Sequence, residues 1–236
     1  MVLDNSHCSE RRVIARYITD RGETLLRQQQ LPDGSLVFEI ISNGVFLMAS
    51  DNQVSERALA NYGLETVVTQ YGSELRVLVG GLGMGLTLQE TLISNIVSVD
   101  VVEIAPDIID WNKTHFATLN GKALSDSRVT IIRDDLYTTL YASPMMKYHA
   151  IMLDVDNGPS WLSHKDNTRL YTLKTLERIS RILVSGGVLT VWSAQSEPEF
   201  LSRMQTVFEH TEEIPIIVSS KNGKKIENFI YRGILV

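Results

Sequence analysis

The stretch RVLVGGLGMG at residues 76–85 is an apolar run that ends in a glycine-rich turn. Its first five residues are typical of a buried strand, and residues 86–93 after the turn have the apolar spacing of a helix. Gly81, Gly83 and Gly85 allow the backbone to turn tightly and to approach a ligand without interference from Cβ atoms. The stretch therefore predicts a strand–turn–helix unit of the kind that binds nucleotides.

Acidic residues follow this turn at informative places. Residues 97–104 form a second predicted strand, and Glu103 lies at its carboxyl end, about 20 residues beyond the turn, where an acid can hold both ribose hydroxyls. A third predicted strand, residues 129–133, is followed by Asp134 and Asp135. Either aspartate could accept a hydrogen bond from an adenine amino group or cap the next helix. The series predicts an adenosine-containing ligand, unless the glycines serve only helix–strand packing.

The rest of the chain beyond residue 76 alternates strands and helices. Further strands are predicted at 148–154 and 188–193, and helices at 105–118, 167–182 and 199–208. The last two strands, 214–219 and 228–235, are joined by a tight turn at 221–224 and must be antiparallel. Alternation of this kind predicts an α/β fold, a mostly parallel Rossmann-like sheet with helices on both faces.

The segment before residue 65 has a different pattern. Turn signals at 32–34 and 42–44 separate short β-rich runs, so this part predicts a small β-hairpin layer followed by a helix at 55–64. The spacing of Val13, Ile14, Tyr17 and Ile18 predicts one apolar face of a helix. We therefore divide the chain into an N-terminal segment, residues 1–64, and a catalytic domain, residues 65–236.

Composition narrows the class of protein. The net charge of −6 argues against nucleic acid as a partner, because a basic footprint is expected there. Cys8 is the only cysteine, so no intrachain disulfide or cysteine metal cluster can form, and no residue spacing indicates a metal site. We see no signal peptide and no apolar run long enough for a bilayer. These features predict a cytoplasmic protein that binds neither membrane nor metal.

The order of these parts resembles the class I methyltransferases and, more closely, the spermidine synthase family of aminopropyltransferases. The resemblance implies a seven-stranded sheet with an antiparallel final strand, S-adenosylmethionine or its decarboxylated form as co-substrate, a polyamine or other small amine as acceptor, and a homodimer. The matching residues are 77–79, Gly81, Gly83, Gly85, Glu90, 101–104, Asp134, 153–154, 158–159, 170–171 and 183–189.

The chain departs from that family at three places. Met84 stands where the family has an aspartate that holds the aminopropyl ammonium, and Val54-Ser55 stands where it has a tyrosine–glutamine pair before Glu56. The loop at 154–159 is shorter than the family's. Two unit charges 4 Å apart interact by about 4 kcal/mol at a dielectric of 20, so a carboxylate at position 84 would favour the decarboxylated cofactor. Our hypothesis is that the synthesis of spermidine from putrescine is weak or absent.

The catalytic role is expected at the end of the fourth strand. Asp154 matches the family's base, which would deprotonate the amine, and Asp156 could anchor a second cationic group. The alternative is that both acids stabilise a turn, for which Asp-Asn-Gly-Pro is suitable. The sequence thus predicts an aminopropyltransferase-like transferase. A methyltransferase acting on a small molecule and an inactive nucleoside-binding or regulatory protein stay open as alternatives.

Overall fold

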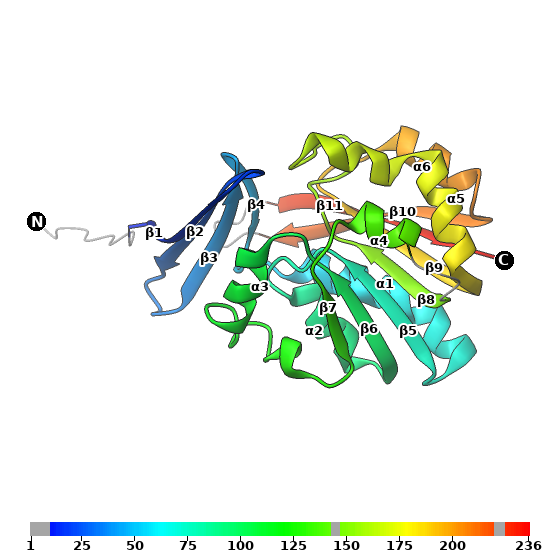
Figure 1. Cartoon of the computed structure of the whole chain (residues 1–236), viewed down its shortest axis with the longest axis horizontal. Coiled ribbons are helices and arrows are strands. Elements are labelled where there is room, and N and C mark those ends of the chain that lie inside the picture. Colours follow the sequence, from blue (N-terminus) through cyan, green and yellow to red (C-terminus); the bar gives the residue numbers. More distant parts are fainter. Residues whose placement is uncertain (1–9, 143–146, 220–224) are drawn as a thin grey trace, which may run out of the picture. The chain divides into compact units, whose positions relative to one another are not determined.

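The structure, a computed structural model, describes residues 10–142, 147–219 and 225–236. The chain divides into two compact units, of which the first ends at Asn52 and the second runs from Gln53 to Val236 (Figure 1). The boundary lies before the helix that we had assigned to the N-terminal segment. This helix joins the second unit because it packs on the strands and helices of the larger sheet.

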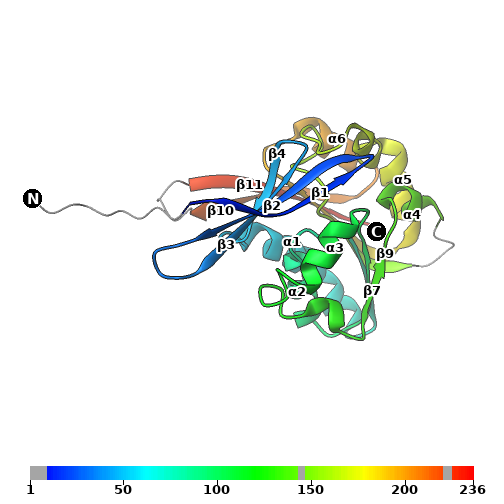
Figure 2. The same cartoon turned by 60° about the vertical axis from the view of Figure 1, so that its left-hand side comes forward.

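The first unit is a four-stranded antiparallel sheet in which each strand pairs with the next, as the hairpin pattern predicts (Figure 2). Its strands are β1 (Arg12–Thr19), β2 (Gly22–Gln30), β3 (Leu36–Ser42) and β4 (Val45–Ala49). The helix expected around residues 13–18 was wrong, because β1 pairs along its length with β2. Val13, Ile14 and Ile18 are β-branched and suit a strand once a partner is present, and this partner is a tertiary feature that spacing cannot reveal.

The second unit contains the predicted seven-stranded sheet, with strand order β10-β11-β9-β8-β5-β6-β7. The five strands β5, β6, β7, β8 and β9 run parallel to one another, whereas β11 is antiparallel to both β9 and β10. The predicted turn at 221–224 lies outside the described residues. The strands are β5 (Leu75–Gly80), β6 (Ile96–Val102), β7 (Val129–Ile132), β8 (Tyr148–Leu153), β9 (Leu183–Ser193), β10 (His210–Ser219) and β11 (Lys225–Ile234).

Helices cover both faces of this sheet. The α-helices are α1 (Val54–Tyr71), α2 (Leu86–Ile93), α3 (Pro106–Lys113), α4 (Leu136–Ala142), α5 (Leu173–Ile182) and α6 (Pro198–Gln205), and the 3₁₀ segments are η1 (Ala123–Ser125) and η2 (Lys165–Tyr171). The single helix predicted at 167–182 is two elements, because the Thr172 side chain caps α5 by accepting a hydrogen bond from the Thr175 amide. α1 packs against α2, β8 and β9, whereas α5 packs against α4, α6 and β9.

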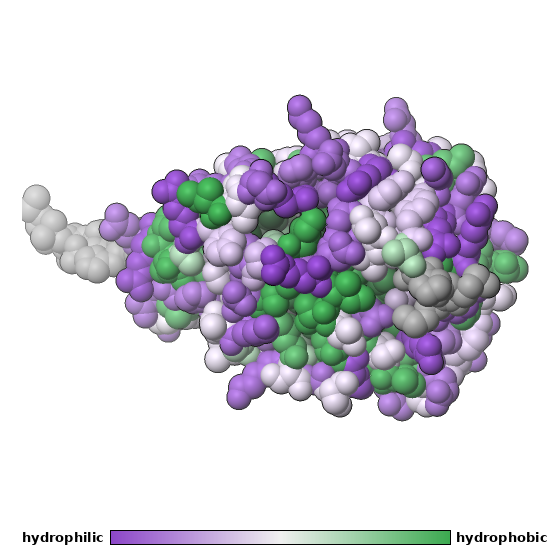
Figure 3. Space-filling model, in the orientation of Figure 1, coloured by the Kyte–Doolittle hydropathy of each residue, from purple (hydrophilic) through white to green (hydrophobic). Residues whose placement is uncertain are grey.

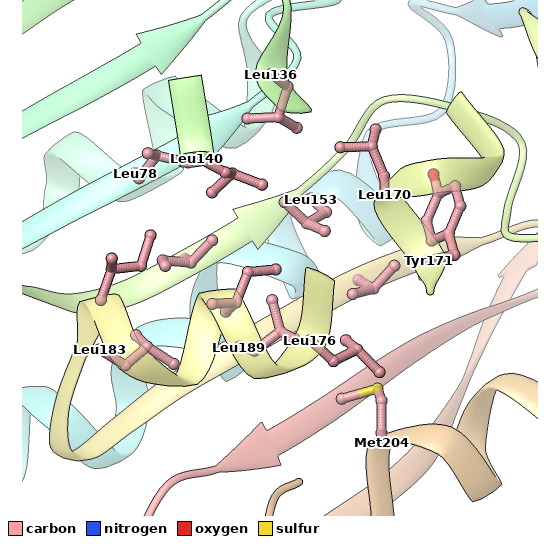
Figure 4. Packing of buried hydrophobic residues seen from close by; sticks show 14 of the residues in the cluster. Leu78, Leu136, Leu140, Leu153, Leu170, Tyr171, Leu176, Leu183, Leu189 and Met204 are labelled. Carbon is pink, nitrogen blue, oxygen red and sulfur yellow. The ribbon is translucent and has the colours of Figure 1, made fainter. Parts of the chain in front are cut away.

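One large apolar cluster holds α4, α5 and α6 against the sheet (Figure 4). Leu140 from α4, Leu176 from α5 and Met204 from α6 are fully buried against strand residues such as Leu78 and Leu189. Burial of each such side chain contributes roughly 1.5–3 kcal/mol, so the cluster fixes the helices and the loops between them.

The surface is different: hydrophilic residues cover most of the face shown in Figure 3, although hydrophobic ones gather near its middle. None of the helices in the described ranges combines the length and hydrophobicity that a membrane span requires.

Candidate active site

The candidate site lies at the carboxyl ends of the parallel strands (Figure 1). β5 lies between β6 and β8, and the chain passes from β5 to β6 on one side and returns to β8 on the other. Open α/β sheets bind ligands at such a switch point, outside the carboxyl ends of the strands. Glu103 follows β6 directly, Asp134 and Asp135 follow β7 closely, Asp154 follows β8 directly, and the glycine turn follows β5.

The glycine turn adopts backbone conformations that require glycine. Gly81, Gly83 and Gly85 have φ angles of 90°, 49° and 78°. A Cβ atom at Gly81 would overlap the carbonyl oxygen of Asp154, and one at Gly85 would lie 2.7 Å from the Asn112 Oδ1 atom. The turn therefore passes close to the end of β8 and packs tightly against the segment that follows β6.

Two buried asparagines that the sequence analysis missed hold this turn in place. Asn112 Nδ2 donates to the Gly83 carbonyl over 2.7 Å, and Asn120 Nδ2 donates to Asn112 Oδ1 over 2.8 Å. Both asparagines are 1% exposed. Asn112 lies among apolar residues of the helix after the second strand, and this is the one sequence signal that it is buried. Its contact with the glycine turn depends on tertiary packing and cannot be predicted from the sequence. The pair fixes the Gly83 carbonyl, while the amides of Gly81, Leu82 and Gly85 donate to Val102, Glu103 and Leu82.

Glu103 is anchored beside the same turn. Its Oε2 accepts from the Leu82 amide at 3.0 Å, and its Oε1 accepts from the Ala105 amide at 2.8 Å. Burial raises the pKa of this carboxyl, while these two amides act in the opposite direction. Each carboxylate oxygen has a second lone pair, so Glu103 can accept two further hydrogen bonds from a sugar.

The two aspartates after β7 have different surroundings. Asp135 Oδ1 accepts from the Thr138 amide at 2.9 Å, which is the hydrogen bond of a helix cap, and its Oδ2 forms an ion pair with Arg169 at 2.8 Å. Asp134 is exposed and accepts only from the Asp135 amide, at 2.8 Å, among the described residues. The geometry therefore leaves Asp134 the freer acceptor for a ligand, and the predicted ligand roles of both aspartates stay predictions.

Asp154 lies at the centre of the strand ends. Its amide donates to the Gly80 carbonyl at 2.7 Å, which ties it to β5, and its Oδ2 accepts from the Thr87 hydroxyl at 2.7 Å. Burial raises the pKa of Asp154, and the hydrogen bond from Thr87 lowers it. The carboxylate thus has one donor and no cationic partner among the described residues.

Glu56, in the first turn of α1, is a second acid at this place that the sequence analysis did not include among the site residues. It is 8% exposed, and its Oε2 accepts from the Ser55 hydroxyl at 2.9 Å. Its pKa is raised to about 7, first by burial and then by the negative charge of Asp154. No sequence signal marks this proximity, because the two residues are almost 100 positions apart in the chain.

Asp156 has a structural environment. Its Oδ1 accepts from the Ser163 amide at 2.8 Å, the Ser163 hydroxyl at 2.6 Å and Asn167 Nδ2 at 3.0 Å. Its Oδ2 accepts from the Tyr171 hydroxyl at 3.1 Å. The four donors show that Asp156, which is 6% exposed, organises the loop after β8, and an additional role as a cation anchor stays a prediction.

Tyr171 also lines a separate pocket of about 460 Å³, which none of the predicted site residues line.

Two departures from the family pattern can also be located. Met84 is completely buried, so its side chain packs inside the protein. Val54 is 53% exposed, whereas Ser55 is buried and accepts from Asn228 Nδ2 at 3.2 Å. Neither position carries a side chain that could replace a charged or aromatic contact with a substrate.

The sheet order, the glycine turn and the acids at the strand ends define a class I methyltransferase-like α/β protein. A family model described as "Spermine/spermidine synthase domain" matches residues 52–214, more than half of the sequence. The chain therefore belongs to the spermine/spermidine synthase family.

Curated relatives agree with this assignment. The chain is 27% identical over 181 residues to a polyamine aminopropyltransferase of Prochlorococcus marinus subsp. pastoris, covering 75% of this chain and 62% of the relative. It is 32% identical over 123 residues to one of Corynebacterium efficiens, covering 51% of this chain and 22% of the relative. The matched part is thus less than two thirds of the length of either relative.

Solved structures share the fold. A spermidine synthase in complex with the transition state analogue AdoDATO superimposes with a TM-score of 0.74 at 17% identity, covering 94% of this chain and 73% of that one. The spermidine synthase from Thermotoga maritima gives a TM-score of 0.71 at 16% identity, covering 94% of this chain and 72% of that one. These likenesses establish the architecture of the chain.

Proposed function

We propose that this protein transfers an aminopropyl group from decarboxylated S-adenosylmethionine to a small amine. The observation that carries the proposal is Asp154, which directly follows β8 and whose backbone lies against the glycine turn. Its carboxylate has no cationic partner among the described residues. Family membership supports aminopropyl transfer over the methyl transfer and the loss of activity that the sequence left open.

The chemistry requires little beyond positioning and one base. The amine nitrogen attacks the methylene carbon beside the sulfonium, and the carbon–sulfur bond breaks with its electrons on sulfur, which leaves as a neutral thioether. An amine arrives as an ammonium ion, so it must lose one proton before the attack. Asp154 accepts that proton, and its raised pKa makes the ionised carboxylate a better base than an exposed aspartate.

The cofactor would lie across the switch point. Glu103 would accept from the ribose hydroxyls, Asp134 from the adenine amino group, and the backbone of the glycine turn would approach the nucleoside closely. Asp135 and Asp156 would support the site by capping α4 and by holding the loop after β8. We infer no metal for this reaction, since the leaving group is neutral.

Product identification tests the proposal. The purified protein is incubated with either decarboxylated or ordinary S-adenosylmethionine and with a panel of small amines, and the nucleoside product is identified. Formation of 5′-methylthioadenosine that depends on the amine would support aminopropyl transfer. S-adenosylhomocysteine would indicate methyl transfer instead, and the absence of both products would indicate a binding protein.

Variants of two aspartates assign the base in that assay. Asp154→Asn is expected to lower the rate by about 100-fold or more, the usual effect of losing general base catalysis. Asp110→Asn, on the exposed side of α3, is the control and should leave the rate unchanged. Equal rates for both variants would contradict the role of Asp154.

The acceptor is expected to differ from putrescine. Position 84 carries a buried methionine in place of an acid, and positions 54 and 55 lack the tyrosine and glutamine of the family pattern. We therefore expect spermidine formation from putrescine to be slow relative to transfer to another amine of the panel. Efficient spermidine formation would overturn this expectation and leave the transferase proposal intact.

We also propose that the protein works in the cytoplasm as a homodimer, as the resemblance implies. The acidic composition and the single cysteine fit a reducing compartment. Light scattering of the purified protein measures its mass directly, and a mass near 26.5 kDa, that of one chain, would refute the dimer.

A further inference from the structure

Glu56 and Asp154 form a pair of carboxylates with unused acceptor capacity. Asp154 Oδ2 accepts from the Thr87 hydroxyl, and no residue in the described part of the chain donates to Asp154 Oδ1. The Glu56 carboxyl accepts from the Ser55 hydroxyl and from its own backbone amide, which leaves lone pairs on its oxygens. The Thr87 hydroxyl also lies 3.4 Å from the Glu56 carbonyl, so it bridges the two residues. The remaining lone pairs belong to Glu56 of α1 and to Asp154, which directly follows β8.

This pair differs from Glu39 and Asp156, two buried acids elsewhere in the chain. Glu39 has Arg11 and Arg27 beside it at 3.2 and 2.8 Å, and Asp156 accepts four hydrogen bonds. Buried charges are normally paired or hydrogen-bonded in this way, because desolvation costs several kcal/mol per ion. Asp154 has no cation beside it among the described residues, so a cation from outside the chain can take this place.

The groups that surround the pair do not supply that cation. Arg57 is the positive charge that acts on Glu56, but it is the weakest of the influences on this acid. Its guanidinium is already engaged by Glu90 at 2.7 Å and by Gln89 at 2.8 Å. Tyr171 senses the charge of Asp154, but its own pKa lies well above the ordinary value, so it stays neutral.

We propose that Glu56 is a second carboxylate of the acceptor site, which pairs with Asp154 to bind the ammonium group of the amine. This inference rests on the proposed function and adds to it a positioning residue from α1. The incoming ammonium supplies the missing positive charge, and its N–H groups can donate to the remaining lone pairs of the two carboxylates. Glu56 then holds the nitrogen while Asp154 removes its proton.

The pair also changes its proton content when the amine binds. The pKa of Glu56 is about 7 in the empty site, so near neutral pH this acid is protonated in about half of the molecules. An ammonium ion beside it stabilises the ionised form and expels that proton. Binding of an amine near pH 7 should therefore release a fraction of a proton from the protein.

Calorimetry with a minimal probe tests the inference. The protein is first saturated with 5′-methylthioadenosine and then titrated with n-butylamine, or with n-butanol as the neutral analogue. We expect the amine to bind at least about tenfold more tightly than the alcohol, as befits a charge-assisted contact. Repetition in two buffers of different ionisation enthalpy gives the number of protons released at pH 7.

Two glutamates of the same helix provide the variant and its control. Glu56→Gln should weaken n-butylamine binding by about 10- to 100-fold and abolish the proton release, with unchanged affinity for methylthioadenosine. Glu65→Gln, at a side chain that is 68% exposed, should change neither quantity.

The outcomes separate this inference from the proposed function. A wild type that bound methylthioadenosine but treated the amine and the alcohol alike would overturn the role of Glu56. So would a Glu56→Gln variant with normal amine affinity and proton release, or one that lost nucleoside and amine binding equally. A wild type that did not bind methylthioadenosine would overturn the proposed function itself, and this inference with it.

Discussion

Removal of the Thr87 hydroxyl should make the proposed base harder to ionise. This hydroxyl donates to Asp154 Oδ2 at 2.7 Å and thereby lowers the pKa of the carboxyl against the effect of burial. The substitution Thr87→Val keeps the shape of the side chain and deletes the donor. The pKa of Asp154 should therefore rise, since the ionised form loses its one side-chain hydrogen bond.

General magnitudes give the size of the effect. A hydrogen bond to a charged group is worth about 1.5–3 kcal/mol, so its loss should reduce the ionised fraction by about 10- to 100-fold at a pH below the pKa. The acidic limb of the profile of kcat/KM against pH should move to higher pH. At a pH above both pKa values the variant and the wild type should have similar rates, because Asp154 is ionised in both.

The assay is the formation of 5′-methylthioadenosine as a function of pH, with Thr91→Val as the matched control. Thr91 lies one turn further along α2, is completely buried, and donates to the Thr87 carbonyl at 2.8 Å. Its loss should cost about 1 kcal/mol of stability but should not shift the profile. Superimposable profiles for Thr87→Val and the wild type, or equal shifts for both variants, would refute the reasoning.

Three further predictions concern stability. Glu56 has a pKa of about 7 in the folded chain against an ordinary value of 4.5, so the free energy of unfolding should fall by about 3 kcal/mol as the pH rises from 4.5 past 7. Urea denaturation at several pH values should show this fall in the wild type, and the fall should be absent in Glu56→Gln. Gly81→Ala should destabilise the protein by well over the roughly 1 kcal/mol of backbone strain, because the added Cβ would overlap the Asp154 carbonyl. Gly72→Ala is the control: its added Cβ has no neighbour within 4 Å, so thermal denaturation should show the strain alone. Asp156→Ala should cost about 3 kcal/mol in urea denaturation by leaving four donors without their acceptor, and a midpoint equal to that of the wild type would contradict this role.

The sequence by itself determined the sheet-forming pattern and the places of the main acids. Residues 76–85 predict the strand, the glycine turn and the start of α2, and Glu103 and Asp154 are found by counting to the ends of their strands. These features depend on local periodicity and on the backbone conformations that glycine allows, both of which short stretches encode. The same locality explains why the antiparallel pair β10–β11 could be predicted from its turn.

Only the tertiary structure decided which groups meet. Residues 13–18 became a strand because β2 offers hydrogen-bond partners, and Asp135 became a cap because α4 begins directly after it. Asn112 reaches the glycine turn and Glu56 reaches Asp154 across 29 and 98 positions in the chain. Such contacts depend on how helices pack on the sheet, and buried area is a property of the whole fold rather than of any short stretch. For this reason the raised pKa of Glu56, which is about 7, could be found only from the tertiary structure.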